Sequence, residues 1–300
     1  MKLSPQAGFT LFLSALVFGD TCWAARCTTN LDQRALGEYE NYLTTVDRIR
    51  IDRFGAGELS WITDPSKSEA ANELHSGKSV RRNIGLNAIN ERIGPWNGTI
   101  IHWIGAIKID GASIGDLKTV LQDYGRYSVI YNPLIYECRA RPILVPTGAA
   151  YDIVFGLQNV YRFGSLFPQH YSFQVKSRSD YSEQPGKNGP GLLVHWRASE
   201  IRESESGVPG RNDFMDVQQD HGILWALNTY WQAREKGPNL YVEFESITLA
   251  RSVQNFKCKI GILPVPKSIV SGVMDSLPAE SLDLMLAATK VECERRAAMR

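Results

Sequence analysis

The sequence predicts an α+β protein in which a curved antiparallel sheet of about seven strands surrounds a long C-terminal helix, with a helical extension before it. Three observations predict this class. Segments rich in β-branched and aromatic residues follow one another over residues 99–251, with turn-forming residues between them. Their apolar residues alternate, which gives the sheet one apolar face that another element has to cover. The segment after Pro278 carries an apolar stripe at helical spacing and is the natural cover.

Residues 1–24 have the features of a secretory signal peptide. Lys2 precedes the apolar run 9–18, and the small residues Ala24 and Ala25 follow it. The run is about half of the roughly 20 apolar residues that a membrane-spanning helix needs, which favours a cleaved signal over a retained anchor. We therefore expect cleavage after Ala24, export, and no transmembrane span after signal removal.

Four cysteines remain after removal of the signal, and an even number in an oxidising compartment favours disulfides. They are Cys27, Cys138, Cys258 and Cys293. They lie too far apart in the sequence for a Cys-x-x-Cys redox or zinc motif. Two disulfides, one disulfide and four buried thiols all remain open.

The overall charge points to no partner. The chain has 33 Lys and Arg residues against 32 Asp and Glu residues, a formal net charge of +1. No global field therefore attracts nucleic acid or acidic lipid headgroups. Three hundred residues with an ordinary apolar share are enough to bury a sizeable core.

Residues 25–97 are predicted to be a helical extension of the main domain, which spans 98–300. Apolar residues recur at three- and four-residue steps over about 31–53, which indicates an amphipathic helix that ends near Gly55. Residues 66–96 are polar and are interpreted as a connecting region with one short helix near its start.

The main domain begins with a strand and two short helices. Residues 99–109 are rich in β-branched side chains, which indicates a strand. Ser113 is a candidate N-cap for a helix over 114–121. A second helical piece, 125–131, ends before Pro133.

Six further strands are predicted, with turn-forming residues between them. Lys236 to Asn239 is interpreted as a tight hairpin, and residues 203–219 as a longer exposed loop. The predicted strands cover about residues 134–144, 150–163, 169–181, 191–203, 221–235 and 239–251.

Alternation along these strands gives the sheet a concave face and an outer face. Tyr241, Glu243 and Glu245 fall on the outer side of the last strand. A helix with Pro278 in its first turn is predicted to cover the concave face, and a shorter helix over 267–276 precedes it. The residues predicted to face each other across this interface are Tyr151, Ile153, Phe155, Leu157, Tyr161, Tyr171, Phe173, Trp225, Leu227, Trp231, Val242, Phe244, Leu282, Met285 and Leu286. Buried area alone does not decide whether they line a cavity or fill a core.

A family resemblance lies in residues 117–133, which contain Asp-Tyr-x-x-Tyr at 123–127 and Tyr-x-Pro at 131–133. This segment is similar to a turn region of bacterial coenzyme Q-binding and polyketide-cyclase-like members of the START-like superfamily, also called SRPBCC or helix-grip. The predicted order of elements is also that of this superfamily. Residues 220–231 and 241–249 resemble uncharacterised, signal-bearing bacterial members, and the resemblance covers about residues 99–296.

The resemblance implies a helix-grip fold with a cavity of about 300 to 1,000 Å³ between sheet and helix. It implies an exported bacterial binding protein, periplasmic or secreted, that holds an apolar small molecule or lipid. Arg126, Arg162 and Asn228 are the candidate polar anchors in this cavity. The alternatives are a cyclase- or hydrolase-like enzyme that uses the same cavity, and a structural factor of the cell envelope.

The sheet order that the resemblance implies also suggests a disulfide pairing. It places the end of the C-terminal helix near the start of the second strand. Cys138 would then pair with Cys293, which leaves Cys27 for Cys258.

No catalytic, metal or cofactor site is predicted. Asp220 and His221 are an acid-base candidate, but neighbouring side chains in a strand diverge, so a hydrogen-bonded turn is favoured. His102 and His195 lie on separate predicted strands without a second ligand at metal spacing, which favours structural roles. The sequence has no nucleophile elbow, phosphate loop or dinucleotide fingerprint.

Overall fold

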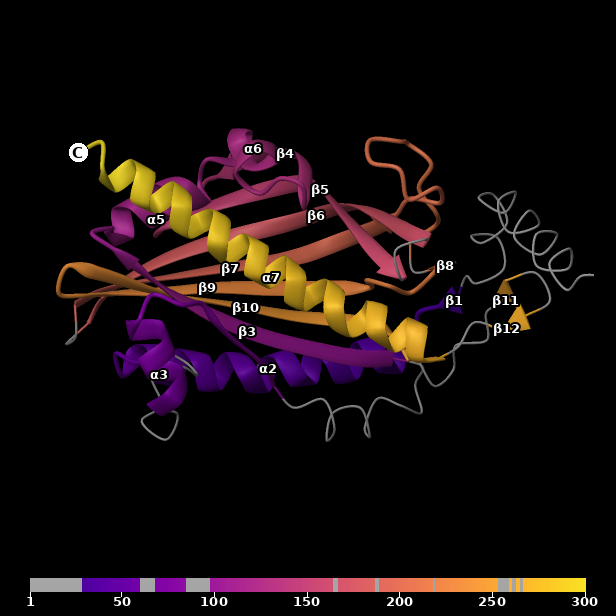
Figure 1. Ribbon diagram of the computed structural model, residues 1–300, viewed down its shortest axis with the longest axis horizontal. Helices are drawn as coiled ribbons and strands as arrows, with labels where there is room; N and C mark the ends of the chain where they lie inside the picture. Colours follow the sequence, from indigo (N-terminus) through magenta and orange to yellow (C-terminus); the bar gives the residue numbers. More distant parts are fainter. Residues whose placement is uncertain are drawn as a thin grey trace, which may run out of the picture.

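The computed structural model describes residues 29–59, 68–84, 98–163, 167–186, 189–217, 219–252, 259–260, 263–264 and 267–300. Within these ranges the main sheet has eight strands in the order β2-β3-β10-β9-β7-β6-β5-β4, all neighbours antiparallel (Figure 1). The strands are β2 (Val80–Asn83), β3 (Gly98–Asp110), β4 (Ile135–Ile143), β5 (Ala149–Phe163), β6 (Phe167–Gly186), β7 (Gly189–Glu203), β9 (Ala226–Lys236) and β10 (Asn239–Arg251). Two small pairs join β1 (Thr29–Asn30) to β8 (Gln219–Asp220) and β11 (Lys259–Ile260) to β12 (Leu263–Pro264).

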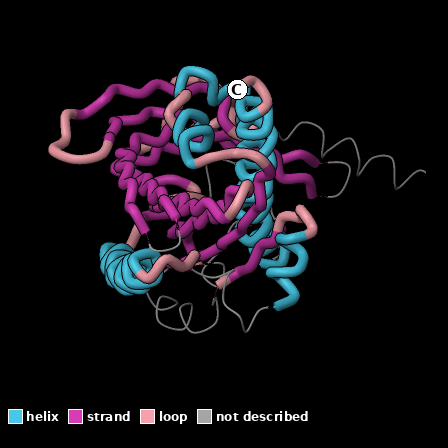
Figure 2. The backbone as a smooth tube through the Cα atoms, turned by 90° about the vertical axis from the view of Figure 1, so that its left-hand side faces the viewer, coloured by secondary structure: helices cyan, strands magenta, loops and turns pink. Residues whose placement is uncertain are grey.

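Helices cover both faces of the sheet. The long helix α7 (Lys267–Ala297) crosses the concave face, and its C-terminal part packs on α5 (Ile114–Leu121) and α6 (Tyr127–Ile130) (Figure 1). The outer face carries α2 (Gln33–Gly55) and α3 (Ser68–His75). Figure 2 shows α2 end-on, with the strands between it and α7. The predicted helix-grip architecture, a curved antiparallel sheet around the C-terminal helix, is confirmed.

Local sequence signals account for the helix positions. Ser113 caps α5, as predicted, because its side chain and the Asp116 carboxylate form a reciprocal capping box. Asp32 caps α2 by accepting a hydrogen bond from the Arg34 backbone N–H at 2.9 Å. The buried stripe of α2, which includes Tyr39 and Leu43, packs on outer-face residues of β3, β9 and β10. None of the helices in the described ranges is both long and apolar enough to cross a membrane.

Gly105 sets how closely α7 approaches the sheet. It lies in the middle of β3, and a Cβ atom built on it would be 2.4 Å from Leu282 Cδ2 and 2.8 Å from Leu286 Cδ1. Both distances are shorter than carbon atoms tolerate, and because Leu282 and Leu286 are fully buried, a side chain here would force these leucines or the helix to shift. The bare backbone at this position lets two leucines of α7 pack directly on the strand.

Three predicted boundaries are corrected. The strand predicted over 221–235 begins only at Ala226, because residues 221–225 form a loop in which Gly222 has φ of 73°. The polar connecting region contains β2, an edge strand paired with β3, so the predicted extension contributes to the main sheet. The two predicted C-terminal helices are one helix, with Pro278 inside it.

Candidate ligand cavity

A cavity of about 130 Å³ lies between the concave face of the sheet and α7. This volume is smaller than the 300 to 1,000 Å³ that the resemblance implied. The wall is made almost entirely of aliphatic and aromatic side chains with a few hydroxyl groups and one amide. Its residues are Ile101, Leu134, Ile135, Phe155, Leu157, Gln158, Phe173, Trp196, Ile223, Leu224, Leu227, Thr229, Phe244, Ser246, Thr248, Pro278, Ser281, Leu282 and Met285.

Seven of the residues predicted for the cavity lie on its wall. They are Phe155, Leu157, Phe173, Leu227, Phe244, Leu282 and Met285. Four others, Ile153, Trp231, Val242 and Leu286, belong to the packed core that continues beyond the cavity. These four side chains belong to the core under the concave face, but other core side chains pack against them, so they do not line the cavity.

The tyrosines of one end of the domain fill the concave face there. The Tyr151 ring lies 5.1 Å from Tyr124 and 5.8 Å from Tyr181 between ring centroids. The hydroxyl of Tyr124 is within 2.7 Å of the Tyr181 hydroxyl, and burial raises the pKa of both. Tyr151 therefore packs against the core instead of lining the cavity. Tyr171, toward the other end of β6, also packs against the core and is not on the cavity wall. The side chain of Tyr161 lies outside the described residues.

Trp225 lies on the opposite side of the sheet from its predicted position. It precedes the first residue of β9, so the alternation of that strand does not apply to it. Its ring packs in the cluster under α2, and its Nε1 donates to Asp220 Oδ1 at 2.9 Å. The prediction of Trp225 as a cavity residue was wrong because the preceding loop reorients the chain.

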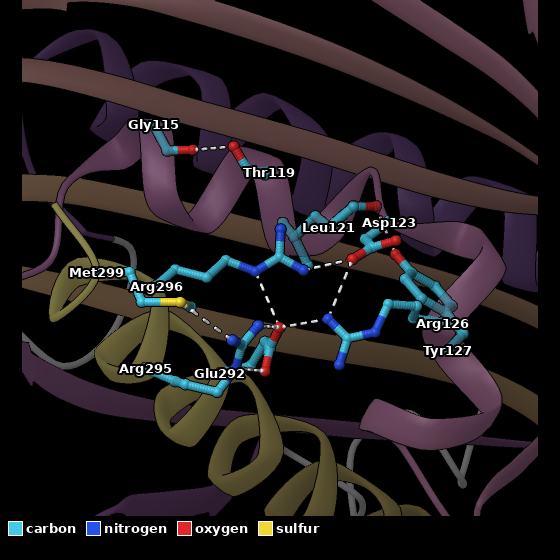
Figure 3. A network of polar contacts seen from close by, with 10 residues as sticks. All are labelled: Gly115, Thr119, Leu121, Asp123, Arg126, Tyr127, Glu292, Arg295, Arg296 and Met299. Carbon is cyan, nitrogen blue, oxygen red and sulfur yellow. Dashed lines mark hydrogen bonds and ion pairs between the residues drawn. The ribbon is translucent and has the colours of Figure 1, made fainter.

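The candidate polar anchors are also corrected. Arg126 is half-exposed and donates from Nη1 to Glu292 Oε1 at 3.0 Å, outside the cavity (Figure 3). Asn228 points to the outer face, where it accepts from His195 Nε2 at 2.8 Å and donates to the Tyr39 hydroxyl at 3.1 Å. The side chain of Arg162 lies outside the described residues.

The contacts of Glu292 hold the C-terminal half of α7 in place. Figure 3 shows that its carboxylate accepts hydrogen bonds from Arg295 and Arg296 of the same helix and from Arg126. Arg296 also pairs with Asp123, next to η4 (Tyr124–Arg126). Hydrogen bonds from Arg295 and, to a smaller extent, from Arg296 lower the pKa of Glu292 to about 2, although partial burial by itself would raise it.

A second buried polar network lies on the outer face under α2. Glu245, fully buried, accepts from Arg50 Nε at 2.8 Å and from His102 Nε2 at 2.6 Å. Burial alone would raise the pKa of Glu245, but Arg50 and His102 outweigh it and hold this pKa at about 2. The other ring nitrogen of His102 is 2.6 Å from the Tyr42 hydroxyl, so both nitrogens have partners. This arrangement supports the structural interpretation of His102.

Asp220 and His221 form the hydrogen-bonded turn that the sequence favoured. Asp220 Oδ1 accepts from the Gly222 N–H at 2.7 Å and from Trp225. His221 Nδ1 pairs with Glu203 Oε1 at 2.9 Å. Burial, with a further contribution from Glu203, raises the pKa of Asp220 to about 6. These groups fasten the loop whose Ile223 and Leu224 line the cavity.

Cys138 and Cys293 are not bonded to each other, which corrects the predicted pairing. Both thiols are free, and burial raises the pKa of each to about 12. η4 and α6 pack on β4, the strand that carries Cys138, and α6 also packs on α7, the helix that carries Cys293. Cys27, Cys258 and the predicted signal peptide lie outside the described residues.

The described wall offers little for catalysis. None of its residues has a carboxylate, imidazole, amine or phenol group that could act as a general acid or base. Among the described residues, no group of three His, Cys, Asp or Glu side chains could hold a metal ion. What the arrangement can do is enclose an apolar molecule and present hydroxyl groups to it.

The chain is similar to several solved structures, while neither a protein-family model nor a curated protein matches it. The Zhui aromatase/cyclase from Streptomyces sp. R1128 has 14% identity over 66% of this chain and 95% of its own, with a TM-score of 0.42. A STAR-related lipid transfer protein from Xanthomonas axonopodis has 10% identity over 65% and 94%, with a TM-score of 0.35. Human STARD10 has 10% identity over 76% and 80%, with a TM-score of 0.36. The helix-grip architecture of this chain follows from its own sheet order and from the position of α7.

Proposed function

We propose that this protein binds an apolar small molecule or lipid in the cavity between the sheet and α7. The observation that carries the proposal is an unfilled space whose described wall is apolar and without ionisable groups. An apolar molecule that covers this wall removes apolar surface from water, which favours its binding.

A pocket of about 130 Å³ is the size of a single aromatic ring or a short chain segment. A larger ligand requires part of the wall to move, and α7 is suited to this. Pro278 borders the cavity and has no backbone N–H to donate within the helix, which weakens α7 there. The helix beyond it is held by the contacts of Glu292 (Figure 3). We propose that the N-terminal part of α7 moves to admit ligand while the C-terminal part stays in place.

Displacement of a neutral fluorescent probe tests the binding function. N-phenyl-1-naphthylamine becomes fluorescent in apolar surroundings, and native mass spectrometry would identify co-purified molecules. We expect Leu227→Trp, which fills the cavity, to abolish probe binding. Leu144→Trp is the matched control, because Leu144 is fully exposed on the other end of the sheet. Equal probe binding by both variants, or binding of neither the probe nor a single-ring apolar compound by the unmodified protein, would refute the proposal.

We also propose that the protein is exported. The support is the sequence of residues 1–24, with its apolar run and small residues before the expected cleavage position. N-terminal sequencing of protein from the periplasm and the medium tests this. We expect a chain beginning at Ala25, whereas a full-length chain confined to the cytoplasm would refute export.

A further inference from the structure

The buried polar network under α2 joins a phenol, an imidazole and a carboxylate in a row. The Tyr42 hydroxyl lies 2.6 Å from His102 Nδ1, and His102 Nε2 lies 2.6 Å from Glu245 Oε1. Tyr42 belongs to α2, His102 to β3 and Glu245 to β10. A hydroxyl next to a base that a third group orients is the arrangement of a triad, here with a tyrosine in the first place. We call these three side chains the Tyr42 relay.

The carboxylate of Glu245 determines which nitrogen of His102 carries a proton. Burial raises the pKa of Glu245, but Arg50 and His102 outweigh it and the result is a pKa of about 2, so this group is ionised. An ionised carboxylate only accepts hydrogen bonds, and His102 Nε2 therefore donates to it. Arg50 already places a buried positive charge beside Glu245, which favours a neutral imidazole. A neutral His102 has its lone pair at Nδ1, where the Tyr42 hydroxyl donates.

The surroundings keep this proton inside the network. His102 and Glu245 are each 1% exposed, so bulk water does not reach the base. The half-buried Tyr42 ring packs against the apolar cluster under α2 and meets the His102 ring edge-on, with 5.7 Å between the ring centroids. A proton that leaves the Tyr42 hydroxyl toward His102 produces an imidazolium beside a carboxylate. That charge pair is a favourable one.

Buried tyrosines elsewhere lack a base. The hydroxyl of Tyr39 donates to the Ile247 carbonyl oxygen at 2.8 Å, and that of Tyr181 donates to the Leu121 carbonyl oxygen at 2.7 Å. A carbonyl oxygen accepts a hydrogen bond but does not take the proton. Burial raises the pKa of both tyrosines, so they hold their protons firmly.

Two other tyrosines each share one property with Tyr42. Tyr241 lies 3.1 Å from Nδ1 of the exposed His75, which has no carboxylate partner among the described residues. Tyr136 is half-buried, as Tyr42 is, and its hydroxyl accepts from Ser172 Oγ at 3.5 Å instead of contacting an imidazole. Tyr241 is thus a control for the histidine alone, and Tyr136 is a control for exposure.

The relay matters for oxidation because a phenol that loses an electron becomes a strong acid. Its oxidation is easy only where a base takes the proton in the same step. The electron itself does not need direct contact between the oxidant and the hydroxyl. A tyrosine with a built-in base can therefore react although its hydroxyl is bonded inside the protein.

We propose that Tyr42 is a site of one-electron oxidation, with His102 as the acceptor of its hydroxyl proton. A peroxyl radical takes one electron from the Tyr42 ring and, with a proton from solvent, becomes a hydroperoxide. The Tyr42 O–H bond breaks, its proton forms an N–H bond at His102 Nδ1, and a neutral phenoxyl radical remains. Glu245 pairs with the new imidazolium. This inference concerns the outer face of the sheet and is independent of the proposed ligand cavity.

The test exposes the unmodified protein to peroxyl radicals from a water-soluble azo initiator in the presence of a spin trap. Peptide mapping by mass spectrometry then measures the modification of each tyrosine. We expect Tyr42 to react roughly tenfold or more faster than Tyr241 and Tyr136, because a positioned base accelerates proton transfer by about 100-fold or more. Reaction of Tyr241 or Tyr136 at the same rate as Tyr42 would overturn the inference.

Variants connect the reactivity to the relay. The tyrosyl signal in electron paramagnetic resonance should disappear in Tyr42→Phe and persist in Tyr241→Phe; the reverse would overturn the inference. His102→Gln keeps an amide donor for Glu245 but has no basic nitrogen, so Tyr42 should react roughly tenfold or more slowly in it. An unchanged rate in this variant, with its fold verified by circular dichroism, would exclude His102 as the base. The comparison of tyrosines within the unmodified protein decides the question even where this variant does not fold.

Nitrogen NMR of His102 checks the premise separately. We expect a proton at Nε2 and none at Nδ1 in the resting protein. A proton at Nδ1 would mean that the base is absent and would overturn the inference.

Discussion

The buried Glu245 network makes a quantitative prediction for stability. Glu245 has no exposed surface and pairs with Arg50, which is itself 2% exposed. Its pKa falls from an ordinary 4.5 to about 2. At about 1.4 kcal/mol per pKa unit, this difference corresponds to about 3 kcal/mol of folding free energy at neutral pH. Because the folded-state pKa is lowered, the contribution is complete above about pH 5 and is lost as the pH falls toward 2.

Glu245→Gln removes this contribution and leaves Arg50 without its buried counter-charge. We expect the variant to be less stable than the unmodified protein by about 3 kcal/mol or more at pH 7. The difference should narrow by about 2 kcal/mol when the pH is lowered to 3, because Glu245 is then mostly protonated in the unfolded chain but still mostly ionised in the folded protein. Urea denaturation followed by circular dichroism at pH 7, 5, 4 and 3 measures both quantities.

Glu183→Gln is the matched control. Glu183 pairs with Lys118 at the surface, where the two side chains are 56% and 35% exposed. An exposed ion pair contributes less than about 1 kcal/mol, so this variant should show almost no change at any pH. A stability gap for Glu245→Gln that stays constant from pH 7 to pH 3 would refute the reasoning.

Three further predictions concern packing, a turn and the thiols. Gly105→Val should lower the free energy of unfolding by about 1 to 3 kcal/mol, because the new side chain clashes with Leu282 and Leu286. Gly115→Ala is the control, because the helix has space for a methyl group there and no loss of stability is expected. Melting temperatures that fall equally in both variants would contradict this prediction. Because the pKa of Asp220 is raised to about 6 in the folded protein, its contribution to stability declines as the pH rises from 4 to 6. The melting temperature of Asp220→Asn should therefore rise relative to that of the unmodified protein between pH 4.5 and pH 7.5. A difference in melting temperature that stays constant over this range would contradict the prediction. Cys138 and Cys293 should react with a thiol reagent only after unfolding, and a peptide map that joins them would disprove free thiols in this fold.

The order and type of the main elements were predictable from local sequence. Alternation identified the concave residues of long strands, such as Phe155, Phe173 and Phe244. The same alternation, continued from Leu227 and Phe244, also points to Thr229 and Ser246, which the prediction passed over because it followed apolar residues only. The sequence pattern was therefore sufficient to place Thr229 and Ser246 on the concave face.

Sequence reasoning failed where a loop or a distant element decides the outcome. Asn228 neighbours Leu227 and Thr229 in a strand and must point the other way, but only the position of α2 shows that Tyr39 is its partner. The sequence places Glu245 on the outer side of its strand. Only the structure shows that α2 covers this side and that Arg50 donates a hydrogen bond to the Glu245 carboxylate.

The longer strands, the cap at Ser113 and the alternation of side chains between two faces follow from local sequence, because they depend on residues within a few positions of one another. The folded chain as a whole fixes which face each helix covers, how closely α7 approaches the sheet at Gly105, and that the Cys138 and Cys293 thiols are free. It also brings Tyr42 of α2 to His102 and Glu245 of the sheet. These outcomes depend on contacts between residues far apart in the chain, and no local pattern specifies such distances.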